Sequence, residues 1–125
     1  MMNRPFRIGT RGSALALWQA NFIKNLILEN YPDLITEIKI IKTEGDRDQK
    51  SELPEIGGKG VFVKEIEDAL LSNNIDAAVH SMKDMPAVLP EGLAIGGVPE
   101  RHDPRDALLS RGGLTLDRLP EGARV

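Results

Sequence analysis

The chain has 125 residues, 41% hydrophobic and 28% charged, which is typical of a globular protein with one modest core and room for the start of a second domain. Its net charge of −3 offers no broad basic field for nucleic acid, and no apolar run is long enough to span a bilayer or to act as a signal peptide. Since it has no cysteine, disulfides and thiolate chemistry within these residues are excluded, and we expect a cytoplasmic protein without nucleic-acid or membrane partners.

The first 42 residues predict a strand, a helix and a second strand. Residues 5–10 are the first strand, and Ser13 after it is a suitable N-cap for a helix. That helix should end near residue 30, because Pro32 disfavours helical geometry in the residue before it. Residues 35–42 alternate apolar and polar side chains and predict a strand. The helical spacing predicts a buried apolar face made of Leu15, Trp18, Phe22, Ile23, Leu26 and Ile27.

The remaining residues continue the alternation of helix and strand. Residues 43–60 have no sustained period and predict a long surface loop, of the kind that often forms a lid or binding segment. A second helix over 61–72, a buried third strand over 75–79 and a fourth apolar run over 93–98 follow. This order predicts an α/β fold with a largely parallel open sheet flanked by helices.

A dense charged segment after Pro99 is typical of a hinge. We therefore expect a first domain over residues 1–99, and a hinge with the start of an incomplete second domain over residues 100–125.

Polar side chains follow two of the predicted strands. Arg11 and Ser13 lie between a strand and a helix N-terminus, where they could bind an anion, or Ser13 could simply cap the helix. Ser81, Lys83 and Asp84 follow the third strand, and open α/β sheets bind ligands beyond the carboxyl ends of their strands. The sequence therefore suggests a site for an anionic substrate, although a Lys-Asp pair in a loop is often only solvated.

Other motifs are weaker. The glycines around Lys59 do not match a phosphate-binding loop, since Leu53 stands where the first glycine is required and Gly60 where a hydroxyl is required. We interpret them as hinges of a mobile loop whose Lys59 is available to a bound anion. Residues 46–48 depart from a calcium loop, and His80 and His102 stand apart in the sequence, so we predict no metal site.

Five sequence blocks together carry a resemblance to one known family: residues 7–20, 43–46, 56–67, 78–86 and 101–107. The family that they resemble is porphobilinogen deaminase, also called hydroxymethylbilane synthase. Five blocks in the same order are more specific than any single one. The resemblance implies a first domain similar to half of a type II periplasmic-binding-protein fold, within a three-domain enzyme. The active-site cleft of that enzyme lies between its first two domains.

The resemblance also implies a chemistry. The family is a transferase of heme biosynthesis that joins four porphobilinogen units head to tail on a covalently held dipyrromethane cofactor, releases ammonia and forms hydroxymethylbilane. Asp84 matches its catalytic carboxylate, which stabilises the cation left when ammonia departs. The positions assigned to substrate and cofactor binding are Arg11, Ser13, Lys59, Phe62, Ser81 and Lys83.

The chain departs from the family by lacking the cysteine that anchors the cofactor and the arginine-rich segment of the second domain. We therefore expect an N-terminal portion of the enzyme that is inactive alone, and a full-length protein that is a monomer acting on the small molecule porphobilinogen. Two alternatives stay open. One is a non-catalytic module of the same half-fold that binds a carboxylate ligand, and the other is a truncated pseudo-enzyme that pairs with another chain.

Overall fold

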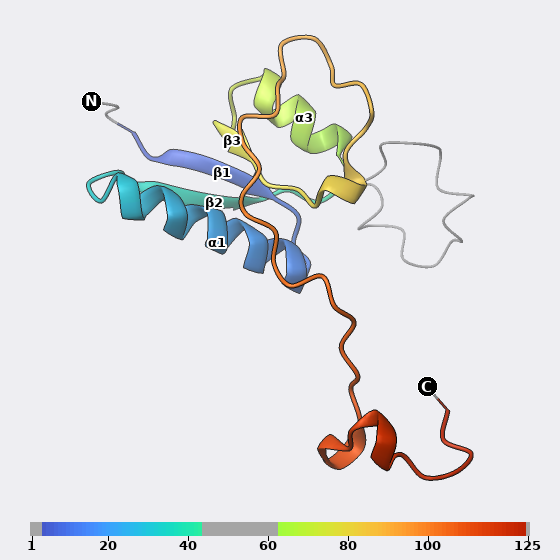
Figure 1. Cartoon of the computed structure of the whole chain (residues 1–125). Coiled ribbons are helices and arrows are strands. Elements are labelled where there is room, and N and C mark those ends of the chain that lie inside the picture. Colours follow the sequence, from blue (N-terminus) through green and yellow to red (C-terminus); the bar gives the residue numbers. More distant parts are fainter. Residues whose placement is uncertain (1–3, 44–62, 125) are drawn as a thin grey trace. The chain divides into compact units, whose positions relative to one another are not determined.

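The computed structural model describes residues 4–43 and 63–124 (Figure 1). The chain divides into two compact units, Met1–Ala94 and Ile95–Val125. The helices and strands of the first unit are, in chain order, β1 (Phe6–Thr10), α1 (Ala14–Asn30), β2 (Thr36–Ile40), α3 (Lys64–Leu71) and β3 (Ala77–Ala78), followed by a 3-10 turn at Met82–Asp84. The predicted α/β fold with a parallel open sheet is confirmed for this part of the chain.

The helix α1 begins and ends where the sequence predicts. The Ser13 hydroxyl accepts a hydrogen bond from the backbone N–H of Ala16 at 3.2 Å, which satisfies one of the donors that a helix N-terminus leaves free. At the other end, the N–H of Tyr31 donates to the carbonyl of Ile27 at 2.9 Å before Pro32 stops the helix. The predicted N-cap and C-terminus are therefore confirmed.

The sheet has the order β2-β1-β3, and both pairings are parallel. Ile8 of the central strand lies opposite Ile38 of β2 on one side and Ala77 of β3 on the other. The first crossover connects β1 to β2 on one side of it, and the second connects β2 to β3 on the other side of β1. Because such crossovers are right-handed, the two helices belong on opposite faces of the sheet. Figure 1 shows α1 and α3 on opposite sides of the strands.

The core of the first unit is built around β1. Ile8 is fully buried, and Ala20 of α1 and Ile66 of α3 are buried with it. Gly9, the next residue of β1, approaches Ile75 so closely that a Cβ atom on it would lie 2.3 Å from the Ile75 Cδ1 atom. The central strand is therefore packed on both faces, as parallel strands between two layers of helices usually are.

One of the predicted strands is wrong, and another is confirmed in part. The run 93–98 forms no strand, and its Ile95 and Val98 are 53% and 68% exposed. The glycines at 96 and 97 supply no side chains to pack and raise the entropic cost of a strand, which accounts for this. The third strand is also shorter than the predicted 75–79, since ladder pairing covers only Ala77 and Ala78.

The predicted apolar face of α1 is also wrong in part. Leu15 and Trp18 are 57% and 53% exposed, whereas Ala20 is the helix residue that is fully buried. Trp18 stacks on Phe22 with ring centroids 5.6 Å apart, as residues four apart on one helix can. The helix thus carries more apolar surface than the sheet covers, and its buried face includes the small side chain of Ala20.

In the described part of the second unit there is no α-helix or strand, only 3-10 turns at Arg111–Gly113 and Leu116–Arg118. Its charged segment is exposed, and the guanidinium of Arg105 donates to the carboxylate of Asp103 at 2.8 Å. The predicted domain boundary at residue 99 stays a prediction. Across the described ranges, no helix has the length and apolar character that a membrane crossing requires.

Candidate functional site

The polar segments singled out from the sequence follow β1 and β3, which are adjacent and parallel. The N–H of Val79 donates to the carbonyl of Gly9 at 3.0 Å, so the two strands end at the same edge of the sheet. Because β2 and β3 are added on opposite sides of β1, the strand order switches direction at β1. In open α/β sheets, ligands bind beyond the carboxyl ends of the strands at this kind of position. The fold therefore brings the segment 11–13 and the segment 80–84 to one edge.

Asp84 is the last residue of the 3-10 turn Met82–Asp84. Its N–H donates to the carbonyl of Ser81 at 3.0 Å, which holds the turn closed. The Asp84 side chain is 25% exposed, and the ammonium of Lys83 lies 3.9 Å from one of its oxygens, with a side chain 78% exposed. An ion pair this long and this exposed contributes little stability. The carboxylate is therefore accessible and only weakly engaged by its neighbour.

His80 links the two halves of the site electrostatically. Burial lowers the pKa of His80 below its ordinary value, the charge of Asp84 raises this pKa, and the charge of Arg11 lowers it. Both charges therefore act on one imidazole, although they come from segments about 70 residues apart in the sequence. Burial therefore disfavours the imidazolium form of His80.

The structure accounts for one role of Ser13 directly. Its hydroxyl oxygen caps α1, and its carbonyl accepts the N–H of Leu17 at 2.9 Å. Ser13 is exposed and Arg11 is half-buried. A capping hydroxyl still has its own proton to donate, so the cap and an anion at this helix N-terminus are compatible.

The structure adds a residue that the sequence interpretation missed. The side-chain N–H of Gln19, on α1, is placed to donate to the hydroxyl oxygen of Ser81 at 3.0 Å. The Ser81 hydroxyl is in turn placed to donate to the amide oxygen of Gln19 at 3.1 Å. The contact joins α1 to the Asp84 turn. A polar residue within the apolar run 14–20 was the available signal, but nothing in its local spacing points to a partner 62 residues away.

We expect this contact to couple the two residues energetically. In a double-mutant cycle, Gln19→Ala and Ser81→Ala should show an interaction free energy of about 0.5–1.5 kcal/mol in urea unfolding, as a half-buried hydrogen-bonded pair does. Asn21 is the control, because its amide donates to Leu17 O of its own helix at 2.8 Å. A cycle of Asn21→Ala with Ser81→Ala should therefore show no coupling, and equal values for both cycles would contradict the contact.

The comparisons with known proteins decide the family. Residues 6–125 match the family model described as "Porphobilinogen deaminase, dipyromethane cofactor binding domain". The chain belongs to the porphobilinogen deaminase family. The porphobilinogen deaminases of Syntrophobacter fumaroxidans and Geobacter metallireducens are 52% and 53% identical to it over 125 residues, all of this chain and 40% and 39% of the relatives. That of Syntrophus aciditrophicus is 56% identical over 119 residues, 95% of this chain and 39% of the relative.

The family predicted from five sequence blocks is therefore confirmed, and the matched domain is the one that binds the dipyrromethane cofactor of porphobilinogen deaminase. The chain spans about 40% of the length of the curated relatives that it matches. Of the residues that the resemblance assigns to the site, Arg11, Ser13, Ser81, Lys83 and Asp84 lie at one edge of the sheet. Lys59 and Phe62 lie outside the described residues.

Within the described ranges, there is no group of three or more His, Cys, Asp or Glu side chains that could hold a metal ion. The described side chains at this edge include the cations of Arg11 and Lys83, the hydroxyls of Ser13 and Ser81 and the carboxylate of Asp84. That donor set suits an organic anion with N–H groups, which offers acceptors to the cations and donors to the carboxylate.

Proposed function

We propose that the chain supplies the catalytic carboxylate and part of the anion-binding surface of a hydroxymethylbilane synthase. This enzyme condenses four porphobilinogen units head to tail into hydroxymethylbilane and releases ammonia. The observation that carries the proposal is that Arg11 follows β1 and Asp84 lies in the turn after β3, two adjacent parallel strands that end at the same edge of the sheet. Membership of the porphobilinogen deaminase family supports it.

The residues present fit a dipyrromethane group in their chemistry. Its acetate and propionate arms are anions, which Arg11 and Lys83 would pair with and the hydroxyl of Ser13 would donate to. Its pyrrole N–H groups need an acceptor, and an ionised carboxylate such as Asp84 only accepts. When bound, the group supplies the nucleophilic pyrrole carbon to which further rings are added. No cysteine of this chain could anchor it, because the sequence has none.

Asp84 has two roles in the proposed reaction. It accepts the pyrrole N–H of the incoming substrate and so holds the reacting carbon in line for bond formation. It also stabilises the positive charge that spreads over the substrate ring as ammonia leaves, an effect that is strong where water is excluded. With 25% of its side chain exposed, the carboxylate can be reached by a substrate and desolvated by it.

The basic groups have the complementary role of binding. Arg11 and Lys83 attract the acid arms of porphobilinogen, while Ser13 and the N-terminus of α1 add neutral donors. Lys59 and Phe62, which lie outside the described residues, are proposed to contribute to substrate binding as the family resemblance implies. The similarity to half of a type II periplasmic-binding-protein fold is likewise part of the proposal, and the order β2-β1-β3 supports it.

The experiment uses a full-length chimera, in which residues 1–125 of this chain replace the matched segment of the Geobacter metallireducens relative. At 53% identity, we expect the chimera to fold and to convert porphobilinogen into a linear tetrapyrrole that mass spectrometry detects. The unaltered relative is the positive control, and the 125-residue chain without its partner segment should give no turnover. A folded chimera that binds porphobilinogen and forms no tetrapyrrole would support the non-catalytic binding module instead.

A further inference from the structure

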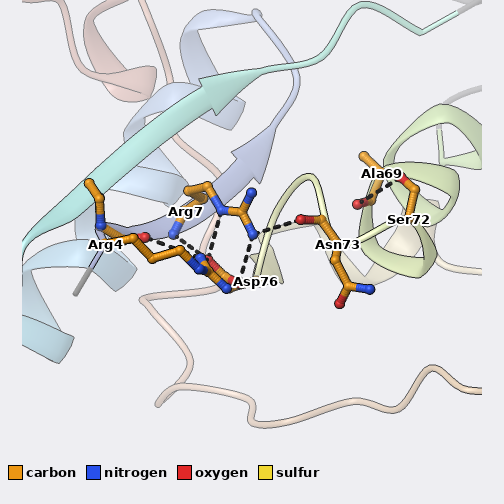
Figure 2. Close-up of polar contacts among 7 residues, drawn as sticks. Arg4, Arg7, Ala69, Ser72, Asn73 and Asp76 are labelled. Atoms are coloured by element: carbon orange, nitrogen blue, oxygen red, sulfur yellow. Dashed lines mark hydrogen bonds and ion pairs between the residues drawn. The ribbon is translucent and has the colours of Figure 1, made fainter. Parts of the chain in front are cut away.

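A second cluster of charge lies at the opposite, amino end of the same strands. The carboxylate of Asp76 receives two hydrogen bonds from the guanidinium of Arg4, at 2.7 and 2.8 Å, and two from that of Arg7, both at 3.0 Å (Figure 2). We call these three residues the Asp76 clamp. Asp76 is 15% exposed and Arg7 17%, whereas Arg4 is 49% exposed. Two planar forks on one carboxylate fix its position more tightly than a single contact does.

The clamp is also joined to the backbone of the sheet. The N–H of Arg7 donates to the Asp76 carboxylate at 2.9 Å, and the N–H of Asp76 donates to the carbonyl of Arg7 at 2.9 Å. These two residues come immediately before the paired residues Ile8 and Ala77. Asp76 therefore extends the pairing of β1 with β3 by one residue, with its side chain and its main chain both bound to the same partner.

The clamp extends to the end of α3 as well. The guanidinium of Arg7 donates to the carbonyl of Asn73 at 2.7 Å (Figure 2). Asn73 has a φ of 57°, the left-handed conformation that commonly follows a helix C-terminus. Arg7 thus holds the turn by which the chain leaves α3 and enters β3.

β3 is too short to fix its own register. Its ladder pairing covers only Ala77 and Ala78, and the next link is the bond of Val79 to Gly9. In a strand, a slip of one residue moves every following residue by about 3.3 Å and turns its side chain to the other face. The turn with Asp84 begins four residues after Ala78, so a slip of β3 would displace the carboxylate.

We propose that the Asp76 clamp positions Asp84: Arg4, Arg7 and Asp76 fix the register of β3 against β1, and β3 in turn places the Asp84 turn at the carboxyl edge of the sheet. This inference rests on the proposed function for its catalytic consequence, but its structural part does not. Hydrogen bonds from Arg4 and then Arg7 hold the pKa of Asp76 well below its ordinary value, so the clamp stays ionised across the pH range of an assay.

The test replaces Asp76 by asparagine in the full-length chimera. We expect kcat to fall by about 10- to 100-fold, because a displaced catalytic group loses its alignment with the substrate. We expect KM to stay within about threefold because, of the basic groups proposed to bind substrate, Arg11 follows β1 and Lys83 is exposed. The matched control is Asp68→Asn, the same change of charge on an exposed residue of α3, which should leave kcat unchanged. Arg4→Ala, which removes only the exposed arm of the clamp, is a milder variant that should fold and show a smaller fall in kcat.

Amide hydrogen exchange on the same variants tests the structural part without substrate. In Asp76→Asn, the backbone amides at position 76 and at Val79 should exchange at least about tenfold faster. The amides of Phe6, which donates to the carbonyl of Ile35, and of Ile41, which donates to the carbonyl of Thr10, should keep their protection. A uniform rise at all four amides would indicate general destabilisation and would overturn the proposal. Faster exchange at position 76 and Val79 alone, together with an unchanged kcat, would also overturn the proposal. If the unmodified chimera makes no tetrapyrrole, the proposed function fails, and unchanged protection at Val79 would still overturn the clamp independently.

Discussion

Replacing Asp84 by asparagine in the full-length chimera is expected to lower kcat for tetrapyrrole formation by about 10²- to 10³-fold and to change KM little. The amide has almost the shape of the carboxylate, but it carries no charge and has one acceptor oxygen in place of two. It therefore cannot stabilise the positive charge that develops as ammonia leaves. Binding depends instead on the basic groups, which the substitution leaves in place. Initial rates across a range of porphobilinogen concentrations separate the two parameters.

The fold should survive this substitution. Asp84 is 25% exposed, and its contact with Lys83 is 3.9 Å long, so its loss changes the unfolding free energy by at most about 1 kcal/mol. The matched control is Asp33→Asn, an exposed aspartate in the turn between α1 and β2, whose kcat should stay within about twofold. A wild-type kcat in Asp84→Asn would remove this residue from the mechanism.

The first strand and helix were predictable because their limits depend on local chemistry. A hydroxyl at Ser13 caps the nearest free N–H groups, and Pro32 blocks helical geometry one residue earlier, whatever the rest of the chain does. Burial is different, because it depends on the width of the surface that a helix meets. Trp18 has the spacing of a core residue, yet a three-stranded sheet does not cover it.

The residues of the site were predictable from the sequence, but the contacts that hold them in place were not. Parallel strands that end in polar segments identify Arg11 and Asp84, and the family resemblance adds their roles. The contacts that hold those segments join residues 62 and 69 positions apart, in the pairs Gln19 with Ser81 and Arg7 with Asp76. No local pattern encodes such a pair, because each partner alone is an ordinary polar residue on a helix or a strand.

Substitution of Gly9 is expected to cause a large loss of stability. A Cβ atom at this position would lie 2.3 Å from the Ile75 Cδ1 atom and 3.3 Å from the Ile41 Cδ1 atom, so the buried Ile75 side chain would have to move. Gly9→Ala should lower the unfolding free energy by about 1–3 kcal/mol, the usual cost of overpacking a core. Gly9→Val, which adds two further methyl groups at the same point, should cost more. The midpoint of urea unfolding measures both.

Gly96→Ala is the matched control for this comparison. Among the described residues, no atom lies within 4 Å of a Cβ atom built at Gly96, so the added methyl group meets no neighbour. Both alanine variants restrict the unfolded chain by the same amount, about 0.4–1 kcal/mol in favour of folding, and this contribution cancels between them. The difference in unfolding free energy therefore reports the contacts of the added methyl group with Ile75 and Ile41. Equal midpoints for the two variants would mean that β1 and the residue Ile75, which precedes β3, are not packed as closely as the structure has them.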